Sequence, residues 1–254
     1  MDITRCTKNR GVWHGIQHLW PESLQDAGGV NSQKVLGMFG KLTTWIYRNA
    51  KHILISSRGF EGSICEKGDF VNKVIYFPNW ADISLGEQSF DNNLPKMPEG
   101  FKVMFAGNIG EAQDMDSLME TALVLKDETD IHFCIVGDGR KRPWVEDFVR
   151  EHDLTSTVHL LGRFPIEMMP AFFAMADVLL VTLKDSKVFN RTAPAKIQAY
   201  MNAGKPIAAM LNGEGSVVIS NAECGFCVAA GDAGAFAHLL KHMKAEKLQE
   251  ILFI

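Results

Sequence analysis

Two glycine-punctuated segments have residue types and spacing suited to binding an anion. Gly107-Asn108-Ile109-Gly110 follows the apolar run Phe101–Ala106, and Gly137-Asp138-Gly139-Arg140 follows Ile131–Val136. Because glycine has no side chain, backbone N–H groups in such loops can approach a phosphate closely. Neither loop matches GxGxxG or a Walker loop, so a plain tight turn is the alternative for each. Two such loops after parallel strands predict a ligand crevice at the carboxyl edge of a sheet.

A third segment, Pro194–Pro206, predicts a short helix between two loops, with Lys196 in its first turn. Proline suits the first turn, where N–H groups without intrahelical partners attract phosphate. Gly204 can adopt the left-handed conformation that closes a helix, and Pro206 prevents its continuation. An ordinary helix–turn–strand junction has the same pattern and is the alternative.

Two other spacings could hold a metal ion or do redox chemistry. Cys224-Gly225-Phe226-Cys227 is a single pair that runs into an apolar strand, which is more typical of packing. His238 and His242 lie four residues apart on a predicted helix without a third ligand, which favours a solvated helix face. We therefore expect no metal and no cofactor. The five scattered cysteines fit reduced thiols in a cytoplasmic protein.

The elements that must position these loops alternate between strand and helix from Phe101 onward, which predicts an α/β domain with a doubly wound parallel sheet. Asp114 is the expected cap of one helix, Pro143 and Pro165 mark the starts of others, and the last helix starts near Asp232. The expected strands are Lys102–Ala106, Ile131–Val136, Val158–Leu161, Val178–Thr182 and Ile207–Met210.

The first 82 residues predict only part of an α/β layer. Helices are expected at Asn31–Asn49 and Gly59–Lys67, and strands at His52–Ser56 and Lys73–Phe77. The segment that follows, to Gly100, is rich in Asn, Pro, Gly and acidic residues without periodicity. We therefore expect a partial domain at residues 1–82, a linker at 83–100 and a complete domain at 101–254.

The composition fits a globular protein, since 46% of the 254 residues are hydrophobic and 22% are charged. A net charge of -4 gives no reason to expect a nucleic-acid partner. No apolar run is long enough to span a membrane, and the first residues lack the apolar core of a signal peptide.

The order of five segments resembles that of the family 4 (group 1) glycosyltransferases, whose GT-B fold has two facing Rossmann-like domains. The segments are Gly107–Gly110, Ile135–Gly139, Val158–Arg163, Ala176–Val178 and Pro194–Pro206. The likeness is strong over Phe101–Ala245, weaker before it, and greatest to amino-sugar (N-acetylfucosamine-type) transferases of O-antigen and capsule synthesis. It implies an N-terminal truncation, because a complete Rossmann-like half needs on the order of 100 further residues before Val12.

The resemblance implies a retaining enzyme that moves a sugar from a nucleotide diphosphate donor, UDP-sugar first, to a lipid-linked or glycan acceptor. It implies donor contacts in four groups: Gly107, Asn108, Ile109, Gly110 and Gln113 at the diphosphate; Gly137, Asp138, Gly139 and Arg140 around the base pocket; Arg163 and Phe164 beside the base; and Ala193, Pro194, Ala195 and Lys196 at the diphosphate and sugar. No catalytic residue is assigned, and His14 and His18 are the only nearby stand-ins.

The chain departs from the family's pattern at the donor site. Two acidic residues eight apart are usual there, the second of them bonded to the donor ribose, and Arg191 and Ala199 stand at those positions. Gln113 stands where a basic residue often contacts the diphosphate. The alternative function is therefore a truncated, catalytically silent domain that binds a nucleotide or a partner. A sugar-nucleotide 2-epimerase and a nicotinamide oxidoreductase fit less well, since the cleft residues of the first and the GxGxxG of the second are not found.

A lipid-linked acceptor would place the protein at the inner face of the cytoplasmic membrane. Four basic residues, Lys34, Lys41, Arg48 and Lys51, interleave with three aromatic ones, Phe39, Trp45 and Tyr47. They predict a basic, aromatic helix surface for peripheral membrane contact. Packing of those aromatic rings in a core is the alternative.

Overall fold

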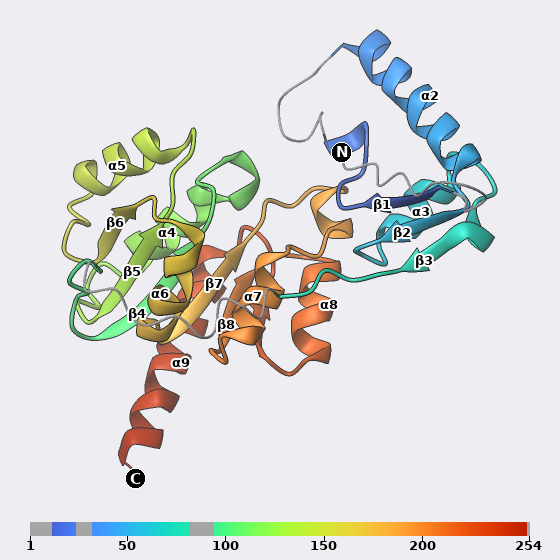
Figure 1. Ribbon diagram of the computed structural model, residues 1–254. Coiled ribbons are helices and arrows are strands. Elements are labelled where there is room, and N and C mark those ends of the chain that lie inside the picture. The colour runs from blue at the N-terminus through green and yellow to red at the C-terminus, as the bar shows by residue number, and fades with distance from the viewer. Residues whose placement is uncertain (1–11, 24–31, 82–93, 253–254) are drawn as a thin grey trace. The chain divides into compact units, whose positions relative to one another are not determined.

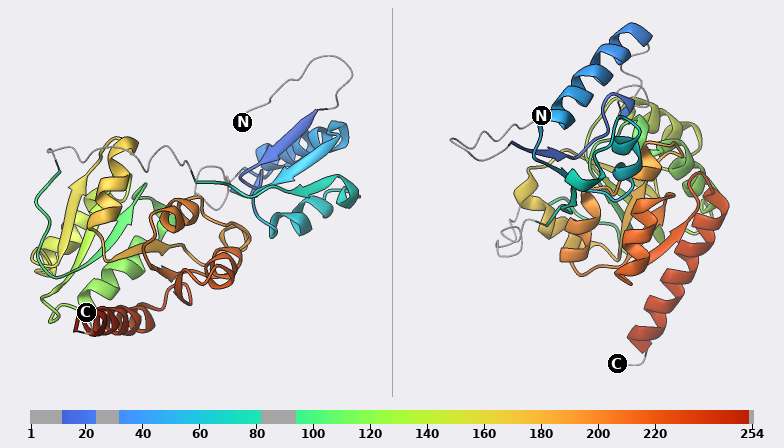
Figure 2. Two further views of the ribbon diagram at one scale, coloured as in Figure 1. Left: turned by 60° about the horizontal axis from the view of Figure 1, so that its bottom comes forward. Right: turned by 90° about the vertical axis from the view of Figure 1, so that its right-hand side faces the viewer.

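The computed structural model describes residues 12–23, 32–81 and 94–252, and the chain divides into two compact units (Figures 1 and 2). The first unit runs to Trp80 and also takes in Ser186–Pro194 and Gly213–Gly215. The second comprises Ala81–Asp185, Ala195–Asn212 and the chain from Ser216. The segments Ser186–Pro194 and Gly213–Gly215 thus group with the first unit, although the sequence analysis assigned them to the domain at residues 101–254.

The second unit is built on six parallel strands in the order β6-β5-β4-β7-β8-β9, a doubly wound arrangement. Every residue of β5, β7 and β8 is buried, as expected for parallel strands covered on both faces. The strands are β4 (Phe101–Ala106), β5 (Ile131–Val136), β6 (Val158–Gly162), β7 (Val178–Thr182), β8 (Ile207–Met210) and β9 (Gly225–Val228).

Helices cover both faces of this sheet. One core joins β4 and β5 to α4 (Met115–Val124), α5 (Arg142–Glu151) and α9 (Ala233–Leu252), through residues such as Leu118, Val145 and Phe236. Helix α6 (Met169–Met175) contacts β4, and α7 (Lys196–Asn202) contacts β7 and β8. Helix α8 (Glu214–Asn221) connects β8 to β9.

The sheet is least complete between its two central strands. Strands β4 and β5 pair along all of Phe101–Ala106, but β4 pairs with β7 only at Val103 and Met104. The strand order reverses at this point, where open α/β sheets leave a crevice beyond the carboxyl ends of their strands. The carboxyl end of β4 therefore lies beside a gap that another element must fill.

The first unit has three parallel strands in the order β1-β2-β3: Trp13–Ile16, His52–Ile55 and Val74–Tyr76. Helix α2 (Gln33–Asn49), helix α3 (Phe60–Cys65) and a 3-10 turn (Val71–Lys73) connect them. Its core includes Ile16, Leu19, Ile53, Phe60 and Ile64.

All five strands expected after residue 100 are confirmed to within one residue, but β1 was not predicted. Gly204 has the expected left-handed conformation, at φ +64°. Asp114 occupies the expected N-cap position of α4, at φ +45°, but its side chain makes no capping hydrogen bond. Asp232, by contrast, accepts a hydrogen bond from the N–H of Ala235 at the start of α9.

The three aromatic residues expected on one basic helix surface do not lie together. Tyr47 is 2% exposed and belongs to the core of the first unit, Phe39 is half-buried against Trp20, and Trp45 is exposed. The packing alternative is therefore correct for Tyr47. Among the described residues, none of the helices combines the length and apolar character that crossing a membrane requires. Of the expected linker, residues 83–93 lie outside the described part and residues 94–100 form no helix or strand.

Candidate functional site

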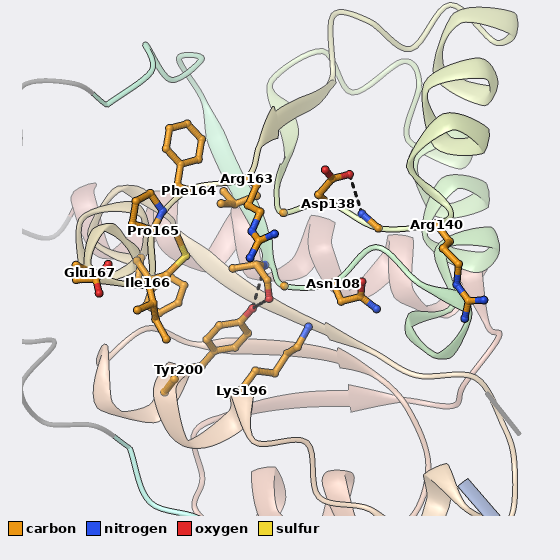
Figure 3. Close-up of a pocket in the computed structure, with 18 residues that line it drawn as sticks. Asn108, Asp138, Arg140, Arg163, Phe164, Pro165, Ile166, Glu167, Lys196 and Tyr200 are labelled. Carbon is orange, nitrogen blue, oxygen red and sulfur yellow. Dashed lines mark hydrogen bonds between the residues drawn. The ribbon is translucent and has the colours of Figure 1, made fainter. Parts of the chain in front are cut away.

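A pocket of about 1380 Å³ opens in the second unit at the carboxyl edge of β4, β5 and β6 (Figure 3). Its walls come from the loops after these three strands and from one side of α6 and α7. It is lined by Ala106, Gly107, Asn108, Val136, Gly137, Asp138, Gly139, Arg140, Arg163, Phe164, Pro165, Ile166, Glu167, Met169, Phe173, Lys196, Ala199 and Tyr200.

The two glycine loops cross in direct backbone contact. A Cβ on Gly137, which has φ +145°, would lie 1.8 Å from the carbonyl oxygen of Gly107, and one on Gly139 would lie 2.3 Å from that of Ile109. The N–H of Gly107 donates to Val136 O at 2.9 Å, and the N–H of Ile109 donates to Asp138 O at 2.8 Å. Only glycine fits these crossings, and the loops therefore form one connected floor to the pocket.

An ionic network ties the first loop to its neighbours on the outer side. Lys141 donates to Asp116 at 2.6 Å, and Lys184 donates to Glu111 at 2.9 Å. The hydrogen bond from Lys184 lowers the pKa of the Glu111 carboxyl. These partly exposed pairs join the segments after β4, β5 and β7.

Lys196 projects from the start of α7 into this pocket, and its ammonium group is buried. Its Nζ atom lies 3.9 Å from the centre of the Phe105 ring and has no hydrogen-bond partner among the described residues. A Cβ on Gly107 would come within 3.2 Å of the same atom. Because glycine has no side chain, the ammonium group can lie directly against the loop. Burial without a counter-charge lowers the pKa of Lys196 to about 7.

A second cation faces the first. Figure 3 shows the side chains of Arg163 and Lys196 pointing toward one another from opposite sides of the pocket, whereas Arg140 points away from both. The guanidinium of Arg163 makes no ion pair within the described part of the chain. Of the two acidic residues in the lining, Asp138 accepts a hydrogen bond from the N–H of Gly139 at 2.8 Å. The centre of the pocket is therefore suited to an anion.

The structure brings together nine of the fifteen residues expected at the donor: Gly107, Asn108, Gly137, Asp138, Gly139, Arg140, Arg163, Phe164 and Lys196. Ile109, Gly110, Gln113 and Ala195 do not line the pocket, although they belong to the same unit. Ile109 points into the core instead, and the backbone carbonyl of Gln113 accepts a hydrogen bond from Thr182. Ala193 and Pro194 group with the first unit.

Sequence reasoning found Arg163 and Phe164 but missed the rest of the wall formed by the segment after β6. Pro165, Ile166, Glu167 and Met169 line the pocket beside Arg163, and Phe164 packs on Phe172 with ring centres 4.7 Å apart. The signal available was the position of this segment directly after a strand that pairs with β5, the strand that carries the second glycine loop.

The two positions that depart from the family's acidic pair lie in different surroundings. Ala199 lines the pocket one turn after Lys196, so no carboxylate is present there. Arg191 groups with the first unit, where its guanidinium donates to Ser63 Oγ at 2.8 Å and lies 3.6 Å from Glu66.

The other candidate residues form no catalytic cluster. His14 lies in β1, where burial lowers its pKa, and His18 is exposed. Burial raises the pKa of the Cys227 thiol to about 11, so this thiol is not activated. Within the described ranges, His, Cys, Asp and Glu side chains form no group of three or more that could hold a metal ion.

The chain is 29% identical over 182 residues to WcaI of Escherichia coli (strain K12), a protein named for glycosyl transfer in colanic acid biosynthesis. This match covers 66% of the chain but 43% of WcaI, so the chain spans less than half of that relative.

Solved structures show the same fold. Anabaena HepE in complex with UDP-glucose superposes with a TM-score of 0.71 at 18% identity, covering 94% of this chain and 64% of HepE. WaaG, a glycosyltransferase involved in lipopolysaccharide biosynthesis, gives a TM-score of 0.71 at 13% identity, covering 92% of this chain and 65% of WaaG. The expected α/β architecture of GT-B type, with Rossmann-like parallel sheets, is confirmed.

The family model for glycosyl transferases of group 1 matches residues 100–245, which hold all six strands of the second unit and the entire pocket lining. This chain belongs to the group 1 glycosyl transferases.

Proposed function

We propose that the pocket binds the nucleotide diphosphate part of a sugar donor, and that this donor is a UDP-sugar. The intact enzyme would transfer the sugar with retention of configuration. The proposed acceptor is a lipid-linked or glycan hydroxyl in cell-surface polysaccharide synthesis, at the cytoplasmic side of the membrane. HepE was solved with UDP-glucose, and the names of WcaI and WaaG refer to cell-surface polysaccharides, which supports this choice. An amino sugar is the proposed group transferred.

One observation carries the proposal: the buried, unpaired ammonium group of Lys196. Removing a charge from water without a partner is costly, and proteins retain such groups mainly at functional sites. A diphosphate beside Lys196 and Arg163 would supply the missing negative charge and form charge-assisted hydrogen bonds.

The remaining lining suggests how the donor would be divided along the pocket. Gly107 and Asn108 line the floor where the glycine loops cross, a position suited to the diphosphate and the sugar. The wall after β6, with Phe164, Pro165 and Ile166, offers apolar surface for the base.

The chemistry asked of these residues is electrostatic. As the glycosidic bond to the diphosphate breaks, negative charge grows on the departing oxygen, and a cation fixed within reach stabilises that charge more than it stabilises the bound donor. Because the pocket fixes the donor, the acceptor hydroxyl can attack from the face that the leaving group vacates.

Calorimetric titration of the full chain with UDP and UDP-glucose tests the donor site. We expect Lys196→Met to weaken binding at least tenfold, whereas Lys205→Met, whose amine donates to Ala174 O outside this pocket, should bind as the unmodified chain does. Absence of heat with UDP-, GDP- and dTDP-sugars, or equal affinity of Lys196→Met, would overturn the assignment.

Nucleotide binding without transfer is a second candidate, favoured by Ala199 at the pocket wall in place of the family's carboxylate. Release of UDP from UDP-sugars in the presence of extracted bacterial lipids separates the two functions. Release that Lys196→Met abolishes supports transfer. Tight UDP binding with no release above the protein-free rate supports the silent domain.

A further inference from the structure

We infer that the donor pocket does not read the 2′-hydroxyl of the ribose, and that dTDP-sugars therefore belong to its substrate class beside UDP-sugars. This inference rests on the proposed function, in which the diphosphate lies at Lys196 and Arg163 and the base lies on the wall after β6. The relevant feature is the part of the pocket between those two places.

The ribose of a nucleoside diphosphate joins the base to the phosphates, so it must lie between the two cations and the wall. Figure 3 shows the ring of Tyr200 in this interval, between Lys196 and Ile166. Phe173 packs edge-on against Tyr200 with ring centres 5.2 Å apart, and both residues line the pocket. We define the middle stretch of the pocket as Met169 and Phe173 of α6 with Ala199 and Tyr200 of α7.

The middle stretch has no side-chain group free to bond a hydroxyl. Met169, Phe173 and Ala199 carry no hydroxyl, amide or charged group. The buried hydroxyl of Tyr200 is already engaged, because it accepts from the N–H of Ala106 at 3.1 Å and donates to the carbonyl oxygen at 3.2 Å. A site that discriminates by a hydroxyl needs a fixed polar partner for it, whereas an apolar surface discriminates weakly. The 2′-hydroxyl therefore contributes little to binding here.

The two carboxylates of the lining lie away from this stretch. Asp138 belongs to the loop after β5 and accepts a hydrogen bond from the N–H of Gly139 at 2.8 Å. In Figure 3, Asp138 lies farther from Tyr200 than Arg163 does, and Glu167 lies beyond Ile166 at the outer end of the wall. Within the described lining, no carboxylate is therefore placed beside the ribose.

The wall proposed for the base suits thymine as well as uracil. Pro165 and Ile166 are exposed, and Phe164 is half-buried. Thymine differs from uracil by one methyl group, which adds apolar contact on such a surface. Because the wall is exposed, this methyl group does not have to displace packed side chains. Neither of the two differences between dTDP and UDP is therefore disfavoured.

Calorimetric titration of the full chain with UDP, dUDP and dTDP tests the inference. UDP and dUDP differ only at the 2′-hydroxyl, and dUDP and dTDP differ only at the methyl group of the base. We expect the Kd values of UDP and dUDP to agree within about threefold, because no fixed hydrogen bond is lost. dTDP should bind at least as tightly as dUDP.

Ala199 offers a pair of matched variants. Ala199→Glu places a carboxylate on the middle stretch, which should bond the ribose hydroxyls and make UDP bind about tenfold more tightly than dUDP. Ala199→Met adds a side chain of similar length without charge and should leave the ratio of the two Kd values unchanged. The ratio is the readout because a glutamate one turn from Lys196 changes the affinity for both nucleotides.

Two results would overturn the inference while the donor site stands. One is dUDP binding weaker than UDP by about tenfold or more in the unmodified chain, as expected when a fixed hydrogen bond to a charged group is lost. Equal affinities in Glu167→Gln would then assign the readout to Glu167. The other is an unchanged ratio in an Ala199→Glu variant that still binds UDP. Failure of all three nucleotides to bind the unmodified chain would instead overturn the proposed function.

Discussion

The hydroxyl of Tyr200 holds the backbone of Ala106 at both of its polar groups, accepting from the N–H at 3.1 Å and donating to the carbonyl oxygen at 3.2 Å. Ala106 lies beyond Met104, where the pairing of β4 with β7 ends. The buried phenol therefore replaces the hydrogen bonds that a neighbouring strand would have made. It also fixes α7, and with it Lys196, against the end of β4.

Replacing this phenol should loosen the site. Tyr200→Phe leaves a buried N–H and a buried carbonyl without their partner, which should lower the free energy of unfolding by about 1–3 kcal/mol. Because Lys196 is one turn away, UDP should also bind more weakly. Urea denaturation and calorimetry measure the two effects. Tyr76→Phe, at a side chain 36% exposed, is the control and should change neither.

Glycine is required at the crossing of the two loops. Gly137→Ala would push a Cβ to 1.8 Å from Gly107 O at φ +145°, so we expect a loss of several kcal/mol or no folded protein. Gly204→Ala is the matched control, since φ is also positive there but nothing lies within 4 Å. It should cost only about 1 kcal/mol from backbone strain. Thermal unfolding compares them, and equal losses would contradict the crossing.

Binding of UDP should depend on pH through Lys196. Its pKa is about 7 in the empty pocket, so above pH 7 the amine is mostly neutral. The amine must then take up a proton when the diphosphate binds. We expect affinity to fall by up to about tenfold per pH unit above 7. Calorimetry at pH 8 in buffers of different ionisation enthalpy should show proton uptake. Lys196→Met should remove both effects, and uptake that persists in this variant would assign the proton to another group.

The same lysine should affect stability in the empty protein. Its pKa falls from 10.5 in the unfolded chain to about 7 on folding, so between these values the unfolded chain holds more protons. The contribution of Lys196 to stability therefore improves as pH rises through this range. Lys196→Met should unfold at a higher temperature than the unmodified chain at pH 6, and the difference should shrink by pH 9.

A pair of histidines should make the second unit sensitive to acid. His132 Nδ1 lies 3.1 Å from His159 Nε2, and burial together with its neighbour lowers the pKa of His159. Below about pH 6.5, His159 therefore binds a proton more readily in the unfolded chain than in the folded state. The free energy of unfolding should fall as pH drops through that value. His159→Gln should flatten the dependence in denaturation at pH 5 and pH 8. An unchanged slope would assign the acid sensitivity to other groups.

The sequence was sufficient for the strands of the second unit because their residues form short, mainly apolar runs, such as Ile131–Val136, in which every residue is buried. Strand β1, with Gly15 in a four-residue run, carries no such signal. Its position depends on pairing with β2. The glycine loops were predictable for a related reason, because each directly follows a buried run.

The roles of Lys196 and Tyr200 could not be predicted in the same way. A lysine in a first helical turn normally extends into water, and only the incomplete pairing of β4 with β7 creates a space for its ammonium beside Phe105. The face that Trp45 and Tyr47 take on α2 likewise depends on which side of the helix meets the sheet. Such properties come from tertiary packing and have no local signature.

The crossing of the two glycine loops also limits how related pockets can diverge. A residue inserted or enlarged in one loop would collide with the backbone of the other, so the floor can change only through coordinated replacements in both. The wall at Arg163–Glu167 carries no such restriction, since Arg163, Pro165, Ile166 and Glu167 are exposed side chains. Variation in donor preference among related chains should therefore accumulate along this wall, while the floor keeps the same form.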